Sequence, residues 1–248
     1  MDYKLYHGDC LEEMDKLIQE NIKVDAIIAD IPFGITACKF DNIIPFDEMW
    51  KRLNKITNEQ SPIVLFGTEP FSSALRMSNI KHYKYDWTWI KNQATNHFHA
   101  KRMPLRKTEN ISVFFKKSSW YNPQKTTGHI PTNSAKGVSD GKVYHGTNTR
   151  NYDGGDTTRM PLNIINFDCV GNYSKIHPNE KPIKLMEYLI KTYTNENETV
   201  LDFTSGSNST GIACQNTNRS FIGIEKDDKY FEIGKNRMDE NNLTIIFQ

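Results

Sequence analysis

The sequence lacks the features of membrane proteins, of disulfide-bonded proteins and of disordered chains. No apolar run approaches the roughly 20 residues that a membrane span needs, and the N-terminus has no basic segment followed by an apolar one. The four cysteines lie far apart without a Cys-x-x-Cys pair, which argues against a zinc knuckle and a disulfide framework. With 14 glycines and 10 prolines among 248 residues, the composition fits neither disorder nor a collagen-like protein. We therefore expect a folded, cytoplasmic protein with no membrane partner.

The charge is nearly balanced overall but unevenly distributed along the chain. The formal net charge is +1, yet residues 1–50 contain four Lys and no Arg against eleven Asp or Glu. Residues 91–125 contain eight Lys or Arg and a single acidic residue, Glu109. Aromatic and histidine side chains are interleaved with these basic residues, so this stretch predicts a nucleic-acid-binding surface. His97 and His99 have no third ligand at a suitable spacing, and we expect no metal site.

Short apolar runs alternate with segments of helical periodicity, which is typical of βαβ units and a parallel sheet. The runs at 24–29 and 199–203 are mostly apolar, as expected for strands buried on both faces. The pattern predicts a single α/β domain over residues 1–248 with a doubly wound, mostly parallel sheet. Predicted strands are 3–6, 24–29, 62–66, 85–91, 110–117, 199–203 and 220–224, and predicted helices are 11–20, 46–56, 71–77, 184–192, 210–215 and 227–238. We expect Trp87 and Trp89, on one strand face, to be core residues.

Residues 118–161 have no clear period and are rich in Thr, Asn, Gly and Lys. An irregular stretch of this length inside a compact domain is usually a functional loop, a disordered segment or a small inserted module. We predict a small insertion at residues 118–163 within the single domain.

Two of the apolar strands end beside a carboxylate and run directly into a glycine-containing turn. The first turn is Asp30-Ile31-Pro32-Phe33-Gly34, and the second, residues 202–211, reads Asp-Phe-Thr-Ser-Gly-Ser-Asn-Ser-Thr-Gly. Open α/β sheets bind ligands outside the carboxyl ends of their strands, and the small residues of the second turn let a cofactor approach the backbone closely. Glu225 follows the strand 220–224, where a carboxylate can hold the two hydroxyls of a ribose.

The second turn does not match the common nucleotide-binding motifs. Asn208 stands where Gly-x-Gly-x-x-Gly would have its second glycine, and the Gly-Lys-Ser/Thr of a phosphate-binding loop is missing. An enzyme that uses a nicotinamide cofactor or a nucleoside triphosphate is therefore disfavoured.

Five segments, found in the same order, resemble the DNA amino-methyltransferases that use S-adenosylmethionine and carry the catalytic motif before the cofactor motif. Residues 30–33 are similar to the family's Asp-Pro-Pro-Tyr, and residues 202–211 resemble its cofactor turn, Asp-Pro-Phe-x-Gly-Ser-Gly-Thr-Thr-Gly. Residues 177–182, His-Pro-Asn-Glu-Lys-Pro, are close to its His-Pro-Thr-Gln-Lys-Pro. Residues 7–11, His-Gly-Asp-Cys-Leu, match its opening Gly-Asp-Cys, and Lys-Thr-Glu-Asn at 107–110 is also similar to a family segment. The likeness covers most of the chain.

The resemblance implies a Rossmann-like fold and methyl transfer from S-adenosylmethionine to the exocyclic N6 amine of adenine in DNA. In that family an acidic first residue in the catalytic turn goes mainly with adenine, and serine mainly with cytosine. The resemblance also implies that the basic stretch 91–125 follows the DNA backbone and that region 118–163 recognises the target sequence. Many such enzymes serve restriction-modification systems, but the sequence does not show whether a cognate nuclease exists.

The catalytic residues implied by the resemblance are Asp30, Ile31, Pro32 and Phe33. Asp30 and the Ile31 carbonyl would each accept a hydrogen bond from the amine, and Phe33 would stack on the extruded base. Asp9 would contact the adenine end of the cofactor, Glu225 its ribose, and Asp202 with its glycine turn the methionine portion. The predicted cofactor-binding residues are Asp9, Cys10, Asp30, Asn179, Lys181, Asp202, Thr204, Gly206, Ser207, Asn208 and Glu225.

Several alternatives stay open at this point. Cytosine N4 is the second candidate target, and RNA or a protein amide is a more distant one. Departures from the family pattern at Ile31, Phe33 and Asn208 motivate a further alternative, a DNA-binding relative with impaired catalysis. The sequence does not determine the oligomeric state, and a homodimer is one candidate arrangement.

Overall fold

The computed structural model of the chain describes residues 2–35, 41–138, 149–171, 176 and 179–246. Cys38, His177 and Pro178 lie outside these residues. The chain divides into two compact units, a larger one of Met1–Asn122 and Asn163–Gln248 and a smaller one of Pro123–Leu162. Within the described ranges, no helix combines the length and the apolar composition that crossing a membrane requires.

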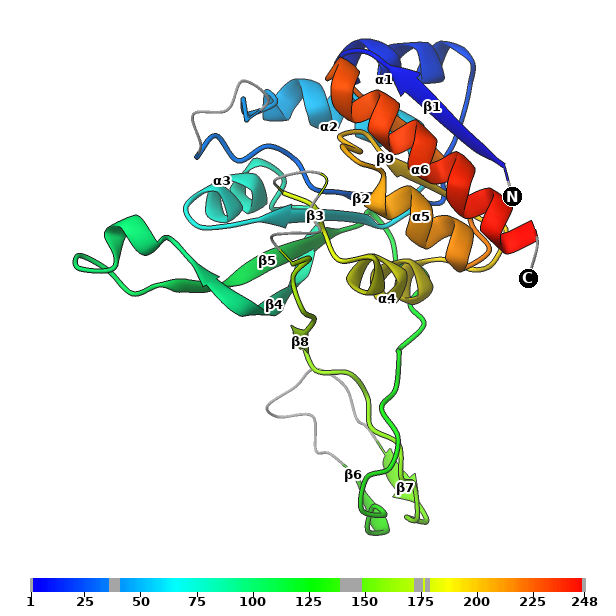
Figure 1. Cartoon of the computed structure of the whole chain (residues 1–248). Helices are drawn as coiled ribbons and strands as arrows, with labels where there is room; N and C mark the ends of the chain where they lie inside the picture. The colour runs from blue at the N-terminus through cyan, green and yellow to red at the C-terminus, as the bar shows by residue number, and fades with distance from the viewer. Residues whose placement is uncertain (1, 36–40, 139–148, 172–175, 177–178, 247–248) are drawn as a thin grey trace. The chain divides into compact units, whose positions relative to one another are not determined.

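The larger unit is built on one eight-stranded sheet with the order β1-β10-β9-β2-β3-β5-β4-β8 (Figure 1). Five of its seven neighbouring pairs are parallel, and only β3–β5 and β4–β5 are antiparallel. The prediction of a doubly wound, mostly parallel sheet is therefore confirmed. The strands are β1 (Tyr3–His7), β2 (Ala26–Ala29), β3 (Ile63–Gly67), β4 (Tyr83–Thr95), β5 (Arg106–Phe114), β8 (Ile164–Asn166), β9 (Thr199–Asp202) and β10 (Ser220–Glu225).

Two hydrophobic cores cover the two faces of this sheet. Side chains alternate across a strand, so Ile27 and Ala29 of β2 lie in one core while Ile28 lies in the other. Helices α1, α2 and α3 pack on the first face, and α4, α5 and α6 pack on the second (Figure 1). The helices are α1 (Cys10–Gln19), α2 (Phe46–Ile56), α3 (Phe71–Ser78), α4 (Ile183–Tyr193), α5 (Ser209–Asn216) and α6 (Asp228–Ile246). Trp87 and Trp89 are each only 2% exposed, which confirms them as core residues.

In the larger unit most elements begin and end within two residues of the predicted positions, but β4, β5 and α6 differ by more, and β8 was not predicted. β4 extends through the polar residues 92–95 because it pairs again with β5, Thr95 opposite Arg106, after an irregularity in register. α6 continues past Met238 because its second half packs on α5, where Asn241 donates a hydrogen bond to Gln215 at 2.9 Å. β8 is only three residues long, too short for periodicity to reveal, and pairs in parallel with β4.

The smaller unit contains a two-stranded antiparallel sheet of β6 (Ala135–Val138) and β7 (Thr149–Tyr152). The stretch predicted to be irregular therefore contains strands. Their composition hides them, because Lys136, Gly137 and Asn151 supply no alternation of apolar and polar residues. Thr126 and Arg159 form a further antiparallel bridge within this unit.

Candidate active site

The two turns singled out in the sequence emerge side by side at the carboxyl edge of the sheet. β2 and β9 are neighbouring parallel strands, with Ala26 opposite Val200 and Ile27 opposite Leu201. The turn after β2 and the turn after β9 are joined directly, because the Thr204 hydroxyl donates a hydrogen bond to the Asp30 carbonyl at 3.1 Å. This edge is where ligands of open α/β sheets bind.

A buried carboxylate, Asp41, shapes the first turn. Its Oδ1 accepts hydrogen bonds from the backbone N–H groups of Phe33 and Gly34, both at 2.8 Å, and its Oδ2 accepts one from Ile35 at 2.9 Å. Gly34 has a φ of +68°, a left-handed conformation in which a side chain is strained. The turn is thus pinned in one conformation by a residue outside the sequence motif.

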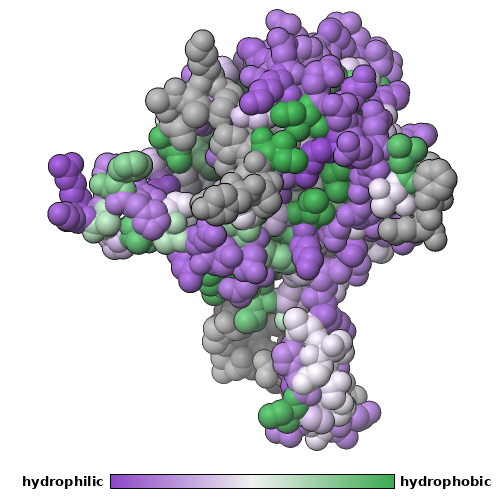
Figure 2. Space-filling view, viewed as in Figure 1, coloured by the Kyte–Doolittle hydropathy of each residue, from purple (hydrophilic) through white to green (hydrophobic). Residues whose placement is uncertain are grey.

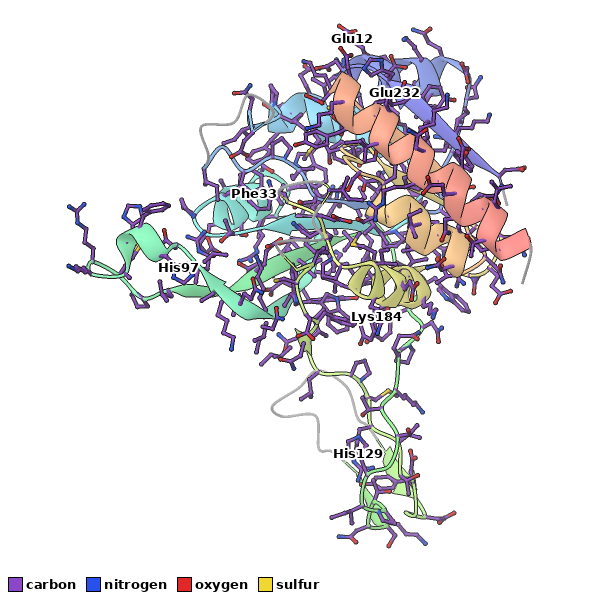
Figure 3. All side chains as sticks on the ribbon, viewed as in Figure 1. Glu12, Phe33, His97, His129, Lys184 and Glu232 are labelled. Atoms are coloured by element: carbon purple, nitrogen blue, oxygen red, sulfur yellow. The ribbon has the colours of Figure 1, made fainter. Side chains whose placement is uncertain are left out.

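The side chains of the first turn have different surroundings. Ile31 is 3% exposed and belongs to the core beneath the first face of the sheet, so its backbone is the part of the residue available to a ligand. Phe33 is half-buried, and its ring lies 5.2 Å from the ring of Phe71 (Figure 3). The carboxylate of Asp30 and the aromatic ring of Phe33, three positions apart in the sequence, thus lie on the wall of the same cavity.

Glu225, at the end of β10, fastens the second turn. Its Oε2 accepts a hydrogen bond from the Gly206 N–H at 2.7 Å, and its Oε1 accepts one from the Asp227 N–H at 2.8 Å. A carboxylate has about four acceptor positions, so two of them stay available for a ligand after these bonds form. Arg237 of α6 holds the next residue of the turn, because it donates to the Ser207 carbonyl at 2.6 Å and pairs with Glu180 at 2.9 Å.

Asn208 has a structural position rather than a place on the cavity wall. Its backbone is left-handed, with φ 60° and ψ 36°, and asparagine tolerates this conformation better than most residues. A Cβ atom on Gly234 would lie 2.6 Å from Asn208 Nδ2, and one on Gly223 would lie 3.1 Å from Oδ1. The Asn208 side chain therefore occupies space that two glycines leave, and Asn208 is not among the residues that line the cavity, so its contact with the cofactor stays a prediction.

Asp202 is buried beneath the second turn. It accepts hydrogen bonds from the Thr204 N–H at 3.1 Å and from the Thr210 hydroxyl at 2.6 Å. Burial raises the pKa of its carboxyl to about 7, the two hydrogen bonds oppose this shift, and the negative charges of Asp30 and Glu225 add to it. The Asp202 carboxyl therefore titrates near neutral pH.

This raised pKa predicts how stability changes with pH. An Asp202 carboxyl that binds its proton more tightly in the folded than in the unfolded state stabilises the fold below its unfolded pKa of about 4, and this stabilisation is lost as the pH rises through about 7. We expect Asp202→Asn to raise the free energy of unfolding at about pH 7.5 by about 2 to 4 kcal/mol relative to the wild type, and to change it little at about pH 4. Urea unfolding at both pH values measures this, and an identical pH dependence in the two proteins would contradict it.

A row of four charged side chains, each at most 20% exposed, begins at Asp30. The Lys181 ammonium lies 2.5 Å from Asp30 Oδ2 and 3.0 Å from Glu109 Oε1, and Lys91 pairs with the other oxygen of Glu109. Burial, opposed by the positive charge of Lys181 and assisted by the negative charge of Glu109, raises the pKa of Asp30 to about 6. Burial also acts to raise the pKa of Glu109, but Lys181 and Lys91 hold it below its usual value.

One cavity of about 1250 Å³ collects most of the residues that the sequence singled out. Asp9 caps α1 by accepting a hydrogen bond from the Leu11 N–H at 3.0 Å, and it also pairs with Lys226. Burial raises the pKa of Cys10 to about 12, so this thiol is neutral. The predicted site residues on the cavity wall are Asp9, Cys10, Asp30, Ile31, Pro32, Phe33, Asn179, Lys181, Asp202, Thr204, Gly206, Ser207 and Glu225.

The hairpin of β4 and β5 carries an exposed tip beside this cavity. The short turn η1 (His97–His99) lies in the tip, where Figure 3 labels His97. Phe98 in this turn is fully exposed. Lys101 and Arg102 follow it and are also exposed. Figure 2 shows apolar and hydrophilic residues side by side at this end of the molecule. His97 and Phe98 line the cavity, so the tip borders the site.

The basic stretch 91–125 does not form one surface, which corrects the sequence-based expectation. Lys91 is 15% exposed and turned inward to Glu109. Lys116 donates to the Asn54 carbonyl at 3.1 Å and Lys117 pairs with Glu59 at 2.7 Å, beyond the other end of β5 from the tip. Within the stretch 91–125, the exposed basic residues next to the cavity are therefore those of the hairpin.

Five residues with clear roles in the site geometry were not singled out by the sequence. They are Asp41, Lys91, Glu109, Glu180 and Arg237. Glu109 was noted as the single acidic residue of a basic stretch and within the family-like segment 107–110, and Glu180 lies in the family-like segment 177–182, but neither was assigned a role in the site. Among the described residues, no cluster of three or more His, Cys, Asp or Glu has the arrangement of a metal site.

Comparison with known proteins adds an independent finding. A family model described as DNA methylase, with N6 and N4 methyltransferases as its members, matches residues 24–236. The chain is 27% identical over 260 residues to the DNA adenine methyltransferase YhdJ of Escherichia coli (strain K12), covering 95% of this chain and 82% of that protein. It is 26% identical over 252 residues to the type II methyltransferase M.HpaI of Haemophilus parainfluenzae, covering 96% of this chain and 75% of the relative.

A solved structure agrees with these sequence matches. The crystal structure of the M1.HpyAVI–SAM complex superposes with a TM-score of 0.67 at 27% identity, covering 96% of this chain and 99% of that one.

Proposed function

Because the chain belongs to the DNA methylase family of N6 and N4 methyltransferases, we propose that its target is the exocyclic N6 amine of adenine. The chain is a DNA methyltransferase that uses S-adenosylmethionine as its methyl donor. The observation that carries the choice of adenine is the acidic residue, Asp30, at the head of the catalytic turn. The similarity to an adenine methyltransferase over 95% of this chain supports the same choice.

The residues of the cavity fit this cofactor. S-adenosylmethionine has ribose hydroxyls but no phosphates, which agrees with a site that has a carboxylate, Glu225, in place of a phosphate-binding loop. The turn at Gly206 and Ser207 is kept open by small side chains, and its conformation is held by Glu225 and Arg237. We assign the ribose hydroxyls to the free acceptor positions of Glu225, the adenine end to Asp9, and the methionine portion to the turn between Asp202 and Ser207.

The acceptor amine needs help from the protein, because its lone pair is delocalised into the aromatic ring. When bound, the cofactor supplies an electrophilic methyl group on a sulfonium. In our proposal Asp30 and the Ile31 carbonyl accept one hydrogen bond each from the amine, so that its lone pair is directed at this methyl group. Positioning of two bound reactants and fixed dipoles supplies most of the acceleration. Phe33 stacks on the target base after it leaves the duplex.

We propose that the β4–β5 hairpin and the smaller unit both contact DNA. The hairpin tip presents an exposed aromatic ring, Phe98, beside Lys101 and Arg102, a combination suited to phosphates and unstacked bases. The smaller unit, residues 123–162, overlaps the insertion expected at 118–163, and we assign to it the recognition of the target sequence.

The hairpin assignment predicts a change in salt dependence. Replacing Lys101 and Arg102 together by Ala removes two phosphate contacts, so the slope of log K for DNA binding against log salt should fall by about 2. Fluorescence anisotropy across a salt titration measures the slope. Lys84→Ala is the matched control, because Lys84 is exposed on β4 at the end of the hairpin opposite the tip. Equal slopes for the double variant and the control would refute the assignment.

Sequencing that detects modified bases tests the proposed function. The chain is expressed in a host without DNA methylases, and the host DNA is sequenced beside DNA from cells that express Asp30→Ala. We expect N6-methyladenine in one sequence context that the variant lacks. Detection of N4-methylcytosine instead would show that the target is cytosine. Unmodified DNA from cells with a folded, cofactor-binding protein would favour a DNA-binding relative with impaired catalysis.

A further inference from the structure

The buried charges beside the catalytic turn come from four separate segments. Asp30 follows β2, Glu109 lies on β5, Lys91 lies on β4, and Lys181 lies in the segment before α4. Their side chains are 20%, 6%, 15% and 10% exposed, respectively. Lys181 bridges the two carboxylates, and each oxygen of Glu109 is paired with a different lysine. Negative and positive charges thus alternate along the row, whose net charge is zero.

Stability alone does not explain a lysine at this place. Burying an ammonium removes its hydration, and replacing a buried ion pair by apolar residues of similar size is often neutral or stabilising. The Lys181 ammonium also lies 5.0 Å from the centre of the Phe66 ring, so an apolar side chain would find apolar neighbours there. We therefore look for a functional explanation of these charges. Of the four residues, only Asp30 belongs to the catalytic turn.

Lys181 restrains Asp30 without using up its capacity to accept hydrogen bonds. Only Oδ2 contacts the ammonium, while Oδ1 is buried and has no hydrogen-bond partner among the described residues. The carbonyl of Asp30 is held separately by Thr204. The carboxylate is thus fixed at one oxygen and retains an unpaired acceptor atom.

We propose that Lys181 is a positioning residue for methyl transfer: held by Glu109 and Lys91, its ammonium keeps the Asp30 carboxylate ionised and oriented to accept a hydrogen bond from the target amine. This inference rests on the proposed function and deepens it. It assigns Lys181 to the catalytic carboxylate rather than to the cofactor. Glu109 and Lys91 contribute indirectly, because they hold the Lys181 ammonium in position and balance its charge.

The charges around Asp30 predict in which direction each substitution should shift the pKa of Asp30. Lys181 and Lys91 favour the ionised carboxylate, whereas burial and Glu109 disfavour it, and together they raise the pKa of Asp30 to about 6. Asp202 faces Asp30 from β9, and Asp30 contributes to its raised pKa. Because the ionised carboxylate is a much stronger hydrogen-bond acceptor than the protonated carboxyl, we expect the rate of methyl transfer to fall as Asp30 is protonated.

Single-turnover rates between about pH 5 and about pH 9 test the proposal, with cofactor prebound and a duplex that contains the sequenced target site. Lys181→Met removes the cation, so the acid limb of the pH–rate profile should move up by about two pH units, and the rate at pH 7 should fall about tenfold. Glu109→Gln removes the anion that opposes ionisation, so the limb should move down. Lys181→Arg should keep the limb close to that of the wild type.

Three further variants separate a positioning role from a structural one. Combining Lys181→Met with Glu109→Gln should shift the acid limb of the pH–rate profile back part of the way toward that of the wild type, because both charges are then removed. Lys91→Met should move it upward by less than Lys181→Met does. Lys184→Met, an exposed lysine in the first turn of α4, is the matched control and should leave it unchanged. Cofactor affinity from calorimetry should stay within a few-fold of the wild type in all of them.

The outcomes distinguish this inference from the proposed function. Shifts in the same direction for Lys181→Met and Glu109→Gln, or a loss of rate that is equal at every pH, would overturn the positioning role while leaving the methyltransferase assignment intact. Unmodified DNA with the wild-type protein would instead refute the proposed function. If Lys181→Met does not fold, the opposite shifts expected from Glu109→Gln and Lys91→Met decide the question.

Discussion

Asp30→Ala should lower the rate of methyl transfer by at least about 1000-fold, with cofactor affinity nearly unchanged. The expectation follows from the geometry of the turn. Asp30 is the only carboxylate in it, and no neighbouring side chain of the turn can accept the amine hydrogen in its place. The loss corresponds to about 4 kcal/mol of transition-state stabilisation, typical for a preorganised group at the reacting centre.

The fold should tolerate this change. Lys181 keeps Glu109 as a partner at 3.0 Å, so the substitution does not leave an isolated buried charge. Asp86→Ala is the matched control, because Asp86 is a half-buried carboxylate on β4 that does not line the cavity. Transfer of labelled methyl groups to DNA and calorimetric titration with S-adenosylmethionine give the two readouts. A rate of methyl transfer for Asp30→Ala close to that of Asp86→Ala would show that Asp30 is not a catalytic residue.

Glu225→Ala should weaken binding of S-adenosylmethionine about 100-fold, equivalent to about 3 kcal/mol. The substitution removes the acceptor for the ribose hydroxyls. It also leaves the Gly206 and Asp227 N–H groups without their partner, so the glycine turn loses its anchor to β10. Both effects act on cofactor binding, and neither touches Asp30. DNA binding without cofactor should therefore be retained.

Calorimetry measures this effect directly, and two variants sharpen it. Glu225→Gln keeps one carbonyl oxygen as an acceptor and should show a smaller loss than Glu225→Ala. Asp228→Ala removes a carboxylate three residues away whose side chain is 94% exposed, and it should bind the cofactor like the wild type. An unchanged dissociation constant for Glu225→Ala would show that the ribose binds in another part of the cavity.

The predicted helices and strands agree best with the structure where the apolar residues of a segment follow a clear pattern. The helix 46–56 was predicted with the observed boundaries, because its apolar residues recur at helical spacing around buried Met49, Leu53 and Ile56. The strands at 24–29 and 199–203 were visible because a strand buried on both faces is apolar throughout. β6 and β7 were missed because their residues show no such alternation.

The sequence by itself determined the sheet class, the two turns and the carboxylates at their heads. These follow from local composition and from the rule that parallel strands end at a common edge. The tertiary structure alone decided which charges meet there. Lys181 reaches Asp30 across 151 positions of sequence, and Asp41 and Arg237 act on turns from outside their motifs. No periodicity encodes such contacts, because a buried charge is located by the packing of the elements that surround it and its pKa by the other charges they bring near.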